Sequence, residues 1–514
     1  MAVALPALLV AGSVGAAPAS WHGFVENETH QRDDVGLAKF RNTAQFEGSK
    51  RVGQAGGFSN VSLHGTFRFT YDGVYDLNDE DYGDQAGGAI QLESVAGSGL
   101  SNHGEGDVSG AIPIFSFGFN HDDPTQANYN PNEGLVVLGS HLHEPDGGVT
   151  FGVPVRPCDV DKRGCIDGYL DYDTDDLRFP EFNERADFIR ELYLRATLPL
   201  ESGANVNFKL GKQQIVWGRT DLFRVLDVLN PVDFSRNNIY DELEEIRIPM
   251  WMLEAEYQVG ATETFDDLNF SLVWNFDKFR PNNLGQGGTP NAILDAGSFF
   301  RGMKNCWDNG CTVSNFAFGA LATDFPKGTI GIRGASMPDW ELRNTQVGAK
   351  VEGVFRDVGF SLNALYYRSQ LPSLRGAGDG AFVVFNPFTG AEVTGIGDDK
   401  ARGIPAFDIH FPRLVMFGGS LDFYVDSIKS VFRVEAAYTK GEEFPNTLEH
   451  ALYSESDVFR WVLGWDRSTW IRAINPNKAI LFSAQVFGQH LLDHELEQRP
   501  LGPVGMPDWE DNYI

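Results

Sequence analysis

The chain has 514 residues, of which 42% are hydrophobic and 12% aromatic, and its formal net charge is −30 at pH 7. No run of about eighteen apolar residues follows the N-terminal stretch, which excludes a bundle of membrane-spanning helices. The acidic charge argues against nucleic acid and anionic lipid surfaces as partners, because both repel an acidic protein. Its 57 glycines and 39 phenylalanines favour strands and turns over helices.

The first residues have the pattern of an export signal. Residues 1–17 are apolar and lead into the small residues Ala16-Ala17-Pro18-Ala19, as in the apolar region and cleavage site of a secretory signal. The basic residues that usually begin such a signal are missing, which indicates a clipped or misassigned start. We predict a signal peptide over residues 1–19; the alternative is a buried N-terminal helix.

Alternating apolar and polar residues then mark strands along the chain. The clearest is 61–72, which has the 9–11 or so residues that a tilted strand needs to cross a bilayer. Phe40, Asn42, Ala44 and Phe46 mark the strand before it. We predict fifteen strands in all, at residues 21–31, 40–46, 61–72, 114–120, 134–141, 187–198, 205–216, 249–258, 269–277, 346–355, 358–368, 413–425, 430–440, 458–466 and 480–489.

From the third strand onward, the connections alternate between short and long. Short ones include 199–204, 259–268, 356–357 and 426–429, whereas long ones include 78–113, 142–186, 217–248, 278–345 and 369–412. Short turns on one side and long loops on the other are typical of an outer-membrane barrel with periplasmic turns and extracellular loops. We therefore predict an all-β, transmembrane, antiparallel up-and-down β-barrel over residues 20–514.

The strand count predicts that the barrel continues beyond this sequence. The fifteenth strand is followed by a long loop, 490–512, and a sixteenth should begin near Tyr513. Single-chain bacterial barrels usually have an even number of strands and must close, because an open edge cannot exist in lipid. We expect about sixteen strands or more in the complete barrel and a truncated C-terminus here.

Four cysteines form two close pairs, Cys158/Cys165 and Cys306/Cys311, in loops rich in Asp, Gly and Pro. Local pairs in an exported chain predict disulfides that staple loops. The alternative is a zinc site made by all four, although their spacing lacks the C-x-x-C knuckles usual for zinc.

The stretch 210–251 carries a family resemblance. It contains LGKQ at 210–213, WG at 217–218, Asp221, FR at 223–224, DVLNP at 227–231, Asp233 and EEIRIPMW at 244–251. These motifs resemble a large family of Gram-negative outer-membrane barrels catalogued as a domain of unknown function (number 1302). FPR at 411–413, RVEAAY at 433–438 and GWDR at 464–467 are similar too. The resemblance covers most of residues 20–514, with departures at Lys212, where the family has Arg, and at the early end.

The resemblance implies an exported barrel in the outer membrane of a Gram-negative bacterium. It further implies a periplasmic lipid-binding-type protein and an inner-membrane exporter as partners, beside the lipid of the outer membrane. It implies no particular substrate.

The charged loop 217–249 is the candidate functional site. Leu222, Val225, Leu226 and Leu229 have helical spacing before Asn230-Pro231, which predicts a short helix over 221–229. Folded into the lumen, this loop would constrict the pore; the alternative is an extracellular loop pinned by ion pairs. The candidate residues, read as structural pairs more than as catalysts, are Arg219, Asp221, Arg224, Asp227, Asn230, Pro231, Asp233, Glu244, Glu245 and Arg247.

Charged residues on the polar faces of the strands are predicted to line the lumen. Positive and negative residues are both present, so they indicate no strong ion selectivity. We interpret most of them as ion pairs that stabilise the wall. They are Glu191, Arg195, Lys209, Glu254, Lys350, Glu352, Arg433, Glu435 and Arg460.

We predict no metal site, cofactor or catalytic residue. Residues 159–168 are similar to an EF-hand loop, but Arg163 occupies a ligand position and the closing Glu is absent. There is no G-x-S-x-G motif, and His64 lies on the polar face, whereas a membrane acyl hydrolase needs its Ser and His on the lipid face. The predicted function is a channel or transport conduit for small, hydrophobic or amphipathic molecules. The alternatives are a surface or adhesion barrel presenting acidic, disulfide-stapled loops and, third, the acyl hydrolase.

Overall fold

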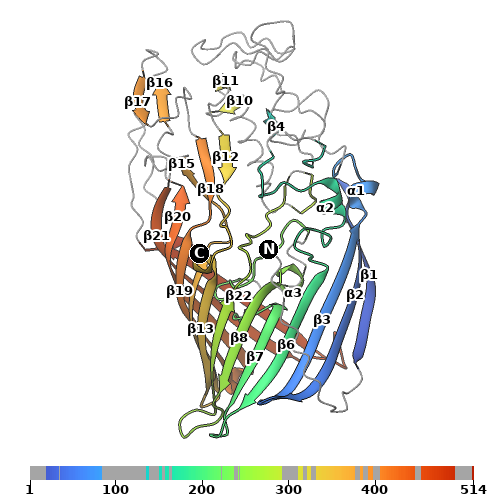
Figure 1. The fold of residues 1–514 in the computed structure, drawn as a ribbon, viewed down its shortest axis with the longest axis vertical. Helices are drawn as coiled ribbons and strands as arrows, with labels where there is room; N and C mark the ends of the chain where they lie inside the picture. Colours follow the sequence, from blue (N-terminus) through green and yellow to red (C-terminus); the bar gives the residue numbers. More distant parts are fainter. Residues whose placement is uncertain are drawn as a thin grey trace.

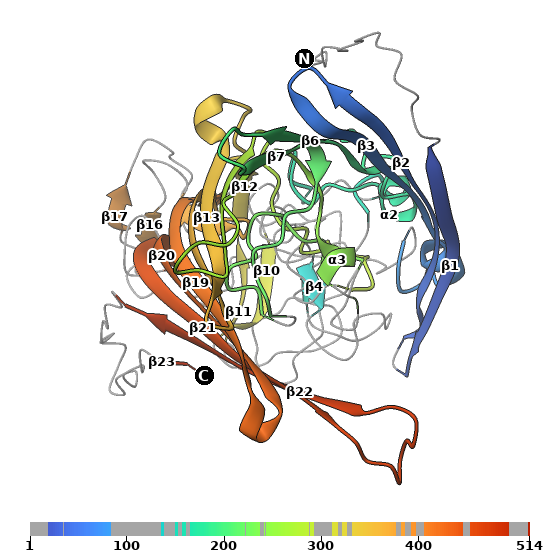
Figure 2. The same cartoon turned by 90° about the horizontal axis from the view of Figure 1, so that it is seen from below.

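The computed structural model describes residues 19–33, 35–83, 135–137, 150–152, 157–160, 165–220, 223–236, 241, 243–286, 288–291, 311–316, 321–325, 331–376, 382–385, 392–396, 406–445, 453–492 and 512–513. Long strands in these ranges form one sheet that curves around an interior (Figures 1 and 2). The predicted signal peptide lies outside the described residues, apart from its last position.

The main sheet has 14 strands that pair antiparallel with their neighbours in chain order, and β1 and β23 are its two edges. This up-and-down order is the one predicted for the wall. The strands are β1 (Ser20–Arg32), β2 (Gly36–Ala55), β3 (Phe58–Asp72), β6 (Ile189–Pro199), β7 (Asn205–Gln213), β8 (Met250–Gln258), β9 (Asp267–Asn275), β13 (Gln346–Phe355), β14 (Val358–Arg368), β19 (Arg413–Val425), β20 (Ser430–Pro445), β21 (Tyr453–Thr469), β22 (Ile480–Leu491) and β23 (Asn512–Tyr513).

Most of the shorter elements gather at the end of the sheet where the long connections lie, whereas the 3-10 turn between β19 and β20 lies at the opposite end (Figure 1). Four small sheets pair β4 with β5, β10 with β11, β12 and β15 with β18, and β16 with β17. No helix in the described ranges is long and apolar enough to cross a membrane. These elements are α1 (Val74–Leu77), β4 (Leu135–Val137), β5 (Thr150–Gly152), α2 (Thr174–Arg178), α3 (Leu243–Ile246), β10 (Cys311–Phe316), β11 (Leu321–Phe325), β12 (Gly331–Ala335), β15 (Ser373–Gly376), β16 (Phe382–Phe385), β17 (Glu392–Ile396), β18 (Ala406–His410) and 3-10 turns at Leu342–Asn344 and Asp426–Ile428.

The predicted sorting of connections by length is confirmed from β3 to β20, but not beyond: connection 446–452, on the side of the long loops, is shorter than connection 470–479 on the other side. The tightest turn, between β13 and β14, places Arg356 at φ 50° and Asp357 at φ 66°. Positive φ at both central residues is what a two-residue hairpin turn requires, because its twist then matches that of the strands. Long connections follow β3, β7, β9 and β14 at the opposite end (Figure 1).

The two faces of the sheet have opposite chemistry. On β14, Leu362 is 63% exposed and Tyr366 is also exposed, whereas Ser361 and Asn363 on either side of Leu362 are buried. The same inversion recurs on β19, where Phe417 is 56% exposed and Ser420 is buried. Large apolar side chains therefore cover the convex face, whereas the interior face carries polar side chains beside an apolar patch. Exposure of so much apolar surface is unfavourable in water at about 25 cal/mol per Å².

Two of the fifteen predicted strands do not belong to the wall. β3 pairs directly with β6, so residues 73–188 form a single connection. Of the strand predicted at 134–141, only residues 135–137 are described; they form β4, which pairs with β5 in a separate sheet. The strand predicted at 114–120 lies outside the described residues. Near the C-terminus, Asn512 and Tyr513 pair with β22, at the place where a further strand was predicted.

Candidate functional site: the inward segment

Residues 214–249 connect β7 to β8, and their described part folds back into the interior of the sheet, so we call it the inward segment (Figure 2). Its apolar side chains, Ile215, Trp217, Val225, Leu226 and Leu229, are all buried. They form one hydrophobic cluster with interior side chains of six strands: Met250 and Met252 of β8, Val273 of β9, Leu365 and Tyr367 of β14, Leu414 and Met416 of β19, Ala437 of β20 and Val462 of β21. The segment is thus packed on the wall.

Two glycines in the wall leave space for side chains of the inward segment. A Cβ at Gly348 of β13 would overlap the Trp217 ring. A Cβ at Gly418 of β19 would lie 2.5 Å from Leu226 Cδ2. Both glycines occupy interior positions where a side chain would push the segment away from the wall. We call Gly348 and Gly418 the glycine sockets.

Asn230 ties the two ends of the segment together. Its side chain is fully buried; Oδ1 accepts a hydrogen bond from the backbone N–H of Ile215 at 2.9 Å. Nδ2 donates to the carbonyls of Ile248 at 2.9 Å and Gln213 at 3.3 Å. The carbonyl of Pro231 accepts from the N–H of Ile248 at 2.8 Å. Asn230 and Pro231 therefore satisfy backbone groups that would otherwise be buried without partners.

Polar residues of β19 and β20 hold the segment at Arg219 and Thr220, and we call this contact the latch. Glu435, fully buried, accepts the backbone N–H groups of Arg219 and Thr220, the latter at 2.8 Å. Arg433 donates to the carbonyl of Arg219 at 2.7 Å, while the Arg219 guanidinium pairs with Asp422. The latch joins residues more than two hundred positions apart. Three of its five members, Arg219, Arg433 and Glu435, were singled out in the sequence, and Thr220 and Asp422 were not.

A buried ion triad stabilises the middle of the segment. Asp227 Oδ2 lies 2.7 Å from Arg247 Nε and 3.5 Å from Arg224 Nε. Arg224 also donates to the carbonyl of Asn230 at 2.6 Å. Removing Asp227 would leave two buried arginines without a carboxylate partner, which is costly.

The helix predicted over 221–229 is wrong for its described part, 223–229, which is irregular. Backbone groups there bond to other partners: Gln370 donates to the carbonyls of Val228 at 2.8 Å and Leu229 at 3.4 Å. The wall contacts outweigh the local helical preference suggested by the leucine spacing. The only helix in the described part of the segment is the single turn α3. Asp221 lies outside the described residues.

The second half of the segment contacts the opposite part of the wall. Glu245 pairs with Arg68 of β3, and the backbone carbonyl of Glu244 accepts from Arg190 of β6 at 2.6 Å. Asp241 pairs with Lys39 of β2 at 3.2 Å. Asp233 caps a local turn by accepting from Ser235 Oγ at 2.6 Å. Because the latch grips β19 and β20 while this half grips β2, β3 and β6, the segment spans the interior.

The residues predicted to line the lumen all lie on interior positions of their strands, and several are paired. Lys350 and Glu352 lie 2.8 Å apart, and Arg460 pairs with Glu442. Arg195 and Lys209 approach the ring of Tyr193, with Lys209 Nζ 4.2 Å from its centroid. Glu191 accepts the backbone N–H of Gln214 at 3.2 Å, and Glu254 lies opposite Lys209 in the register.

Asp187 ties together the bases of two long connections and β7. It lies 2.8 Å from Lys212 Nζ and 2.7 Å from an Arg280 guanidinium nitrogen, and it accepts from Asn183 Nδ2 at 2.8 Å. Burial alone would raise the pKa of Asp187, but the positive charges and hydrogen bonds of Arg280 and Lys212 outweigh it and hold that pKa well below its usual value. Lys212 therefore supplies one of the two cations that hold Asp187.

Replacing Asp187 with asparagine is expected to lower the free energy of unfolding by about 3 kcal/mol at neutral pH. Because the folded-state pKa is depressed, this stabilisation is fully present above the unfolded pKa of about 3.9 and is lost as pH falls below it. Urea titrations at neutral and acidic pH would measure both effects. Asp175→Asn is the matched control. The Asp175 side chain is 86% exposed, so its ion pair with Arg178 should contribute little to the free energy of unfolding. An equal loss in both variants would contradict the prediction.

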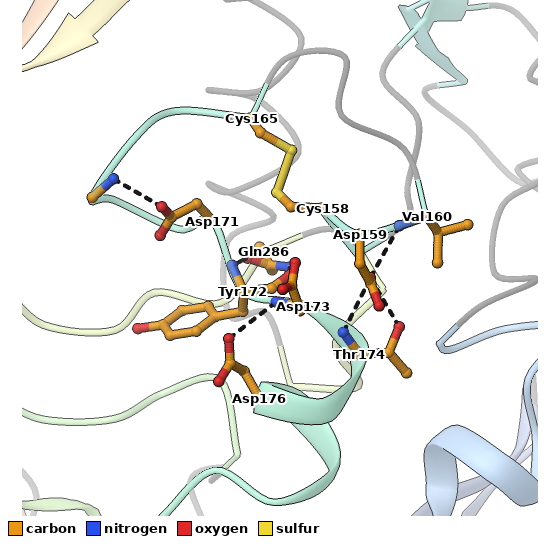
Figure 3. Close-up of a disulfide and its surroundings, with 11 residues drawn as sticks. Cys158, Asp159, Val160, Cys165, Asp171, Tyr172, Asp173, Thr174, Asp176 and Gln286 are labelled. Atoms are coloured by element: carbon orange, nitrogen blue, oxygen red, sulfur yellow. Dashed lines mark hydrogen bonds between the residues drawn. A yellow bond between two sulfur atoms is a disulfide. The ribbon is translucent and has the colours of Figure 1, made fainter. Parts of the chain in front are cut away.

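The predicted disulfide between Cys158 and Cys165 is present and closes a small loop beside α2 (Figure 3). Asp159 accepts from the N–H and the hydroxyl of Thr174, each at 3.1 Å. Gln286 bonds to both the N–H and the carbonyl of Tyr172, each at 2.8 Å. Asp159 is thus used as a structural cap in a loop similar to an EF-hand. The predicted Cys306–Cys311 pair lies partly outside the described residues.

A cavity of about 1,020 Å³ is lined by residues of the inward segment and of β14, β19, β20, β21 and β22. Among the described residues, no group of three or more His, Cys, Asp or Glu side chains is placed to hold a metal ion.

The fold and this site together define an all-β protein whose antiparallel sheet has an apolar convex face and a polar interior occupied by its own chain. The chain belongs to the family described as Protein of unknown function (DUF1302), whose model matches residues 11–512. No curated protein matches the sequence. A solved structure of OmpT (in-vitro folded), an outer membrane protein of Vibrio cholerae in its trimer form, aligns at 8% identity with a TM-score of 0.25, over 96% of this chain and 95% of that chain. A structural similarity at this level supports no conclusion about this chain.

Proposed function

We propose that the chain is an outer-membrane β-barrel that conducts small molecules, hydrophobic or amphipathic ones among them, and that the inward segment narrows the passage. The observation that carries this proposal is the inverted chemistry of the sheet: exposed Leu362 and Phe417 outside, and buried polar residues inside. A lipid bilayer is the surrounding in which an apolar convex face and a hydrated interior are both stable.

Aromatic rings near the short turns support the same placement. Phe265 lies against Phe355 and Phe360, with ring centroids 5.9 Å and 5.7 Å apart, and Phe423 stacks on Phe432 at 5.7 Å. Membrane barrels carry aromatic girdles at the two interfaces with water. The short-turn end would then face the periplasm and the long connections the outside.

The interior supports a conduit better than an enzyme, because its charges are used in holding the chain. Asp422, Arg433 and Glu435 grip the inward segment, and Arg460 pairs with Glu442. A periplasmic lipid-binding-type protein and an inner-membrane exporter are the partners we propose, on the strength of the family resemblance.

Liposomes reconstituted with the full-length protein test the proposal. We expect them to take up small solutes faster than empty liposomes, with a cutoff at larger sizes because the inward segment occupies the interior. A series of solutes from ions to sterol-sized amphiphiles would measure that cutoff. If amphiphiles are transferred only after a periplasmic partner is added, the protein is a dedicated conduit and not an open channel. No transfer of any solute under either condition would overturn the proposal.

A further inference from the structure

The cavity beside the inward segment has the size and the shape of a binding site. Its volume of about 1,020 Å³ lies at the upper end of the range of roughly 300–1,000 Å³ usual for small-molecule sites. One wall belongs to the inward segment and the other to the sheet, so the cavity exists only while the segment is packed inward. Phe223 of the segment stacks on Phe487 of β22, with centroids 4.8 Å apart, and closes one side.

Apolar side chains form much of the lining. Val225 and Val228 contribute from the segment, Leu414 and Met416 from β19, and Leu371 from the residues just after β14. Leu371 remains 53% exposed, which indicates that its side chain meets open space. An apolar body placed here would remove this surface from water, which is favourable in proportion to the area covered.

Most of the charges around the cavity are engaged in ion pairs. Four arginines and four acidic residues are found among its described lining residues. Each arginine has a carboxylate partner: Arg219 with Asp422, Arg460 with Glu442, and Arg224 and Arg247 with Asp227. A charged ligand would therefore have to compete with these ion pairs for a counter-charge, and burying its charge would be costly.

Uncharged polar groups are present beside the apolar ones. Gln370, Thr439 and Gln489 line the cavity, and Gln489 orients its amide by accepting from Arg460 Nε at 2.9 Å. Such groups can bond a hydroxyl or a carbonyl without any net charge.

We propose that this cavity is a saturable binding site for an uncharged amphiphile, a molecule with an apolar body and one or a few hydroxyl or carbonyl groups. This inference rests on the proposed conduit, and it adds that cargo stops at a site formed by the inward segment. The conduit would then select by apolar bulk and by absence of charge.

Photo-cross-linking of the full-length protein in lipid nanodiscs tests the site. The probe is a long-chain alcohol bearing a diazirine, and the comparison probes are the carboxylate and the amine of the same chain. We expect the alcohol to label peptides of residues 214–249 and 369–376 saturably, with displacement by excess unlabelled alcohol. The charged probes should bind about tenfold more weakly or worse.

Leu371→Trp fills the cavity and is expected to weaken labelling of these peptides by about tenfold. Leu362→Trp, on the convex face of β14, is the matched control and should leave it unchanged. Labelling confined to convex-face peptides, equal labelling by charged probes, or insensitivity to Leu371→Trp would overturn the inference. Solute uptake by liposomes carrying Leu371→Trp separates the two proposals. Uptake without saturable labelling would support the conduit and contradict the binding site.

Discussion

Glu435→Ala is expected to release the inward segment from β20 and to raise conductance through the proposed barrel. The substitution leaves the buried N–H groups of Arg219 and Thr220 without their acceptor, at a cost of about 3 kcal/mol. A change of that size shifts the equilibrium between packed and detached segment by roughly a hundredfold. Recordings in planar bilayers should show longer or more frequent openings than in the wild-type protein.

The control for this prediction lies at the same level of the wall. Glu352, Ser361, Ser420 and Glu435 lie opposite one another across β13, β14, β19 and β20. Glu352 pairs with Lys350 and not with the inward segment, so Glu352→Ala should leave the openings nearly unchanged. Glu435→Gln keeps one acceptor oxygen and should fall between the wild-type protein and Glu435→Ala. Unchanged conductance in Glu435→Ala, with protease cleavage showing that the segment is detached, would contradict the idea that the segment narrows the passage.

Local alternation predicted the wall well because the period of two is a property of each strand by itself. The alternating pattern alone predicts that Phe417 and Ser420 lie on opposite faces of the sheet, without knowledge of the neighbouring strands. The same argument placed Arg433, Glu435 and Arg460 on the interior face. Alternation does not say which sheet a strand joins, and for this reason residues 134–141 were counted in the wall although only β4 is found there, paired with β5.

The contacts of the inward segment could be predicted only in part. DVLNP at 227–231 and the charges around it marked the site, yet the helical spacing of its leucines predicted a helix that its described part does not form. The decisive partners are distant: Asp422 meets Arg219 across more than two hundred residues. A pattern within one segment holds no information about such partners. The alternating pattern of β19 could have predicted one of these partners. It places Asp422 on the same face as Ser420, so that the carboxylate lies inside the sheet.

Gly348→Ala and Gly418→Ala, combined, are expected to destabilise the packed inward segment by about 2–6 kcal/mol, at about 1–3 kcal/mol for each overpacked site. The new Cβ at Gly418 would lie 2.5 Å from Leu226 and 2.6 Å from the carbonyl of Ala436, and the one at Gly348 would overlap Trp217. The contact with Ala436 lies within the wall and strains it locally. The contacts with Leu226 and Trp217 can be relieved by movement of the segment, so solute uptake by liposomes should rise together with tryptic cleavage within the segment.

Gly464 of β21 provides the matched control for the glycine sockets. It also faces the interior, yet a Cβ there would meet its nearest neighbour, Arg433 Cβ, at an ordinary 3.6 Å. Gly464→Ala should change neither uptake nor cleavage, although it alters the backbone in the same chemical way. Equal effects in all the variants would mean that alanine acts by stiffening the strands. Increased uptake confined to the socket variants would assign the effect to the packing of Trp217 and Leu226, and with it the role of the inward segment as the narrow part of the passage.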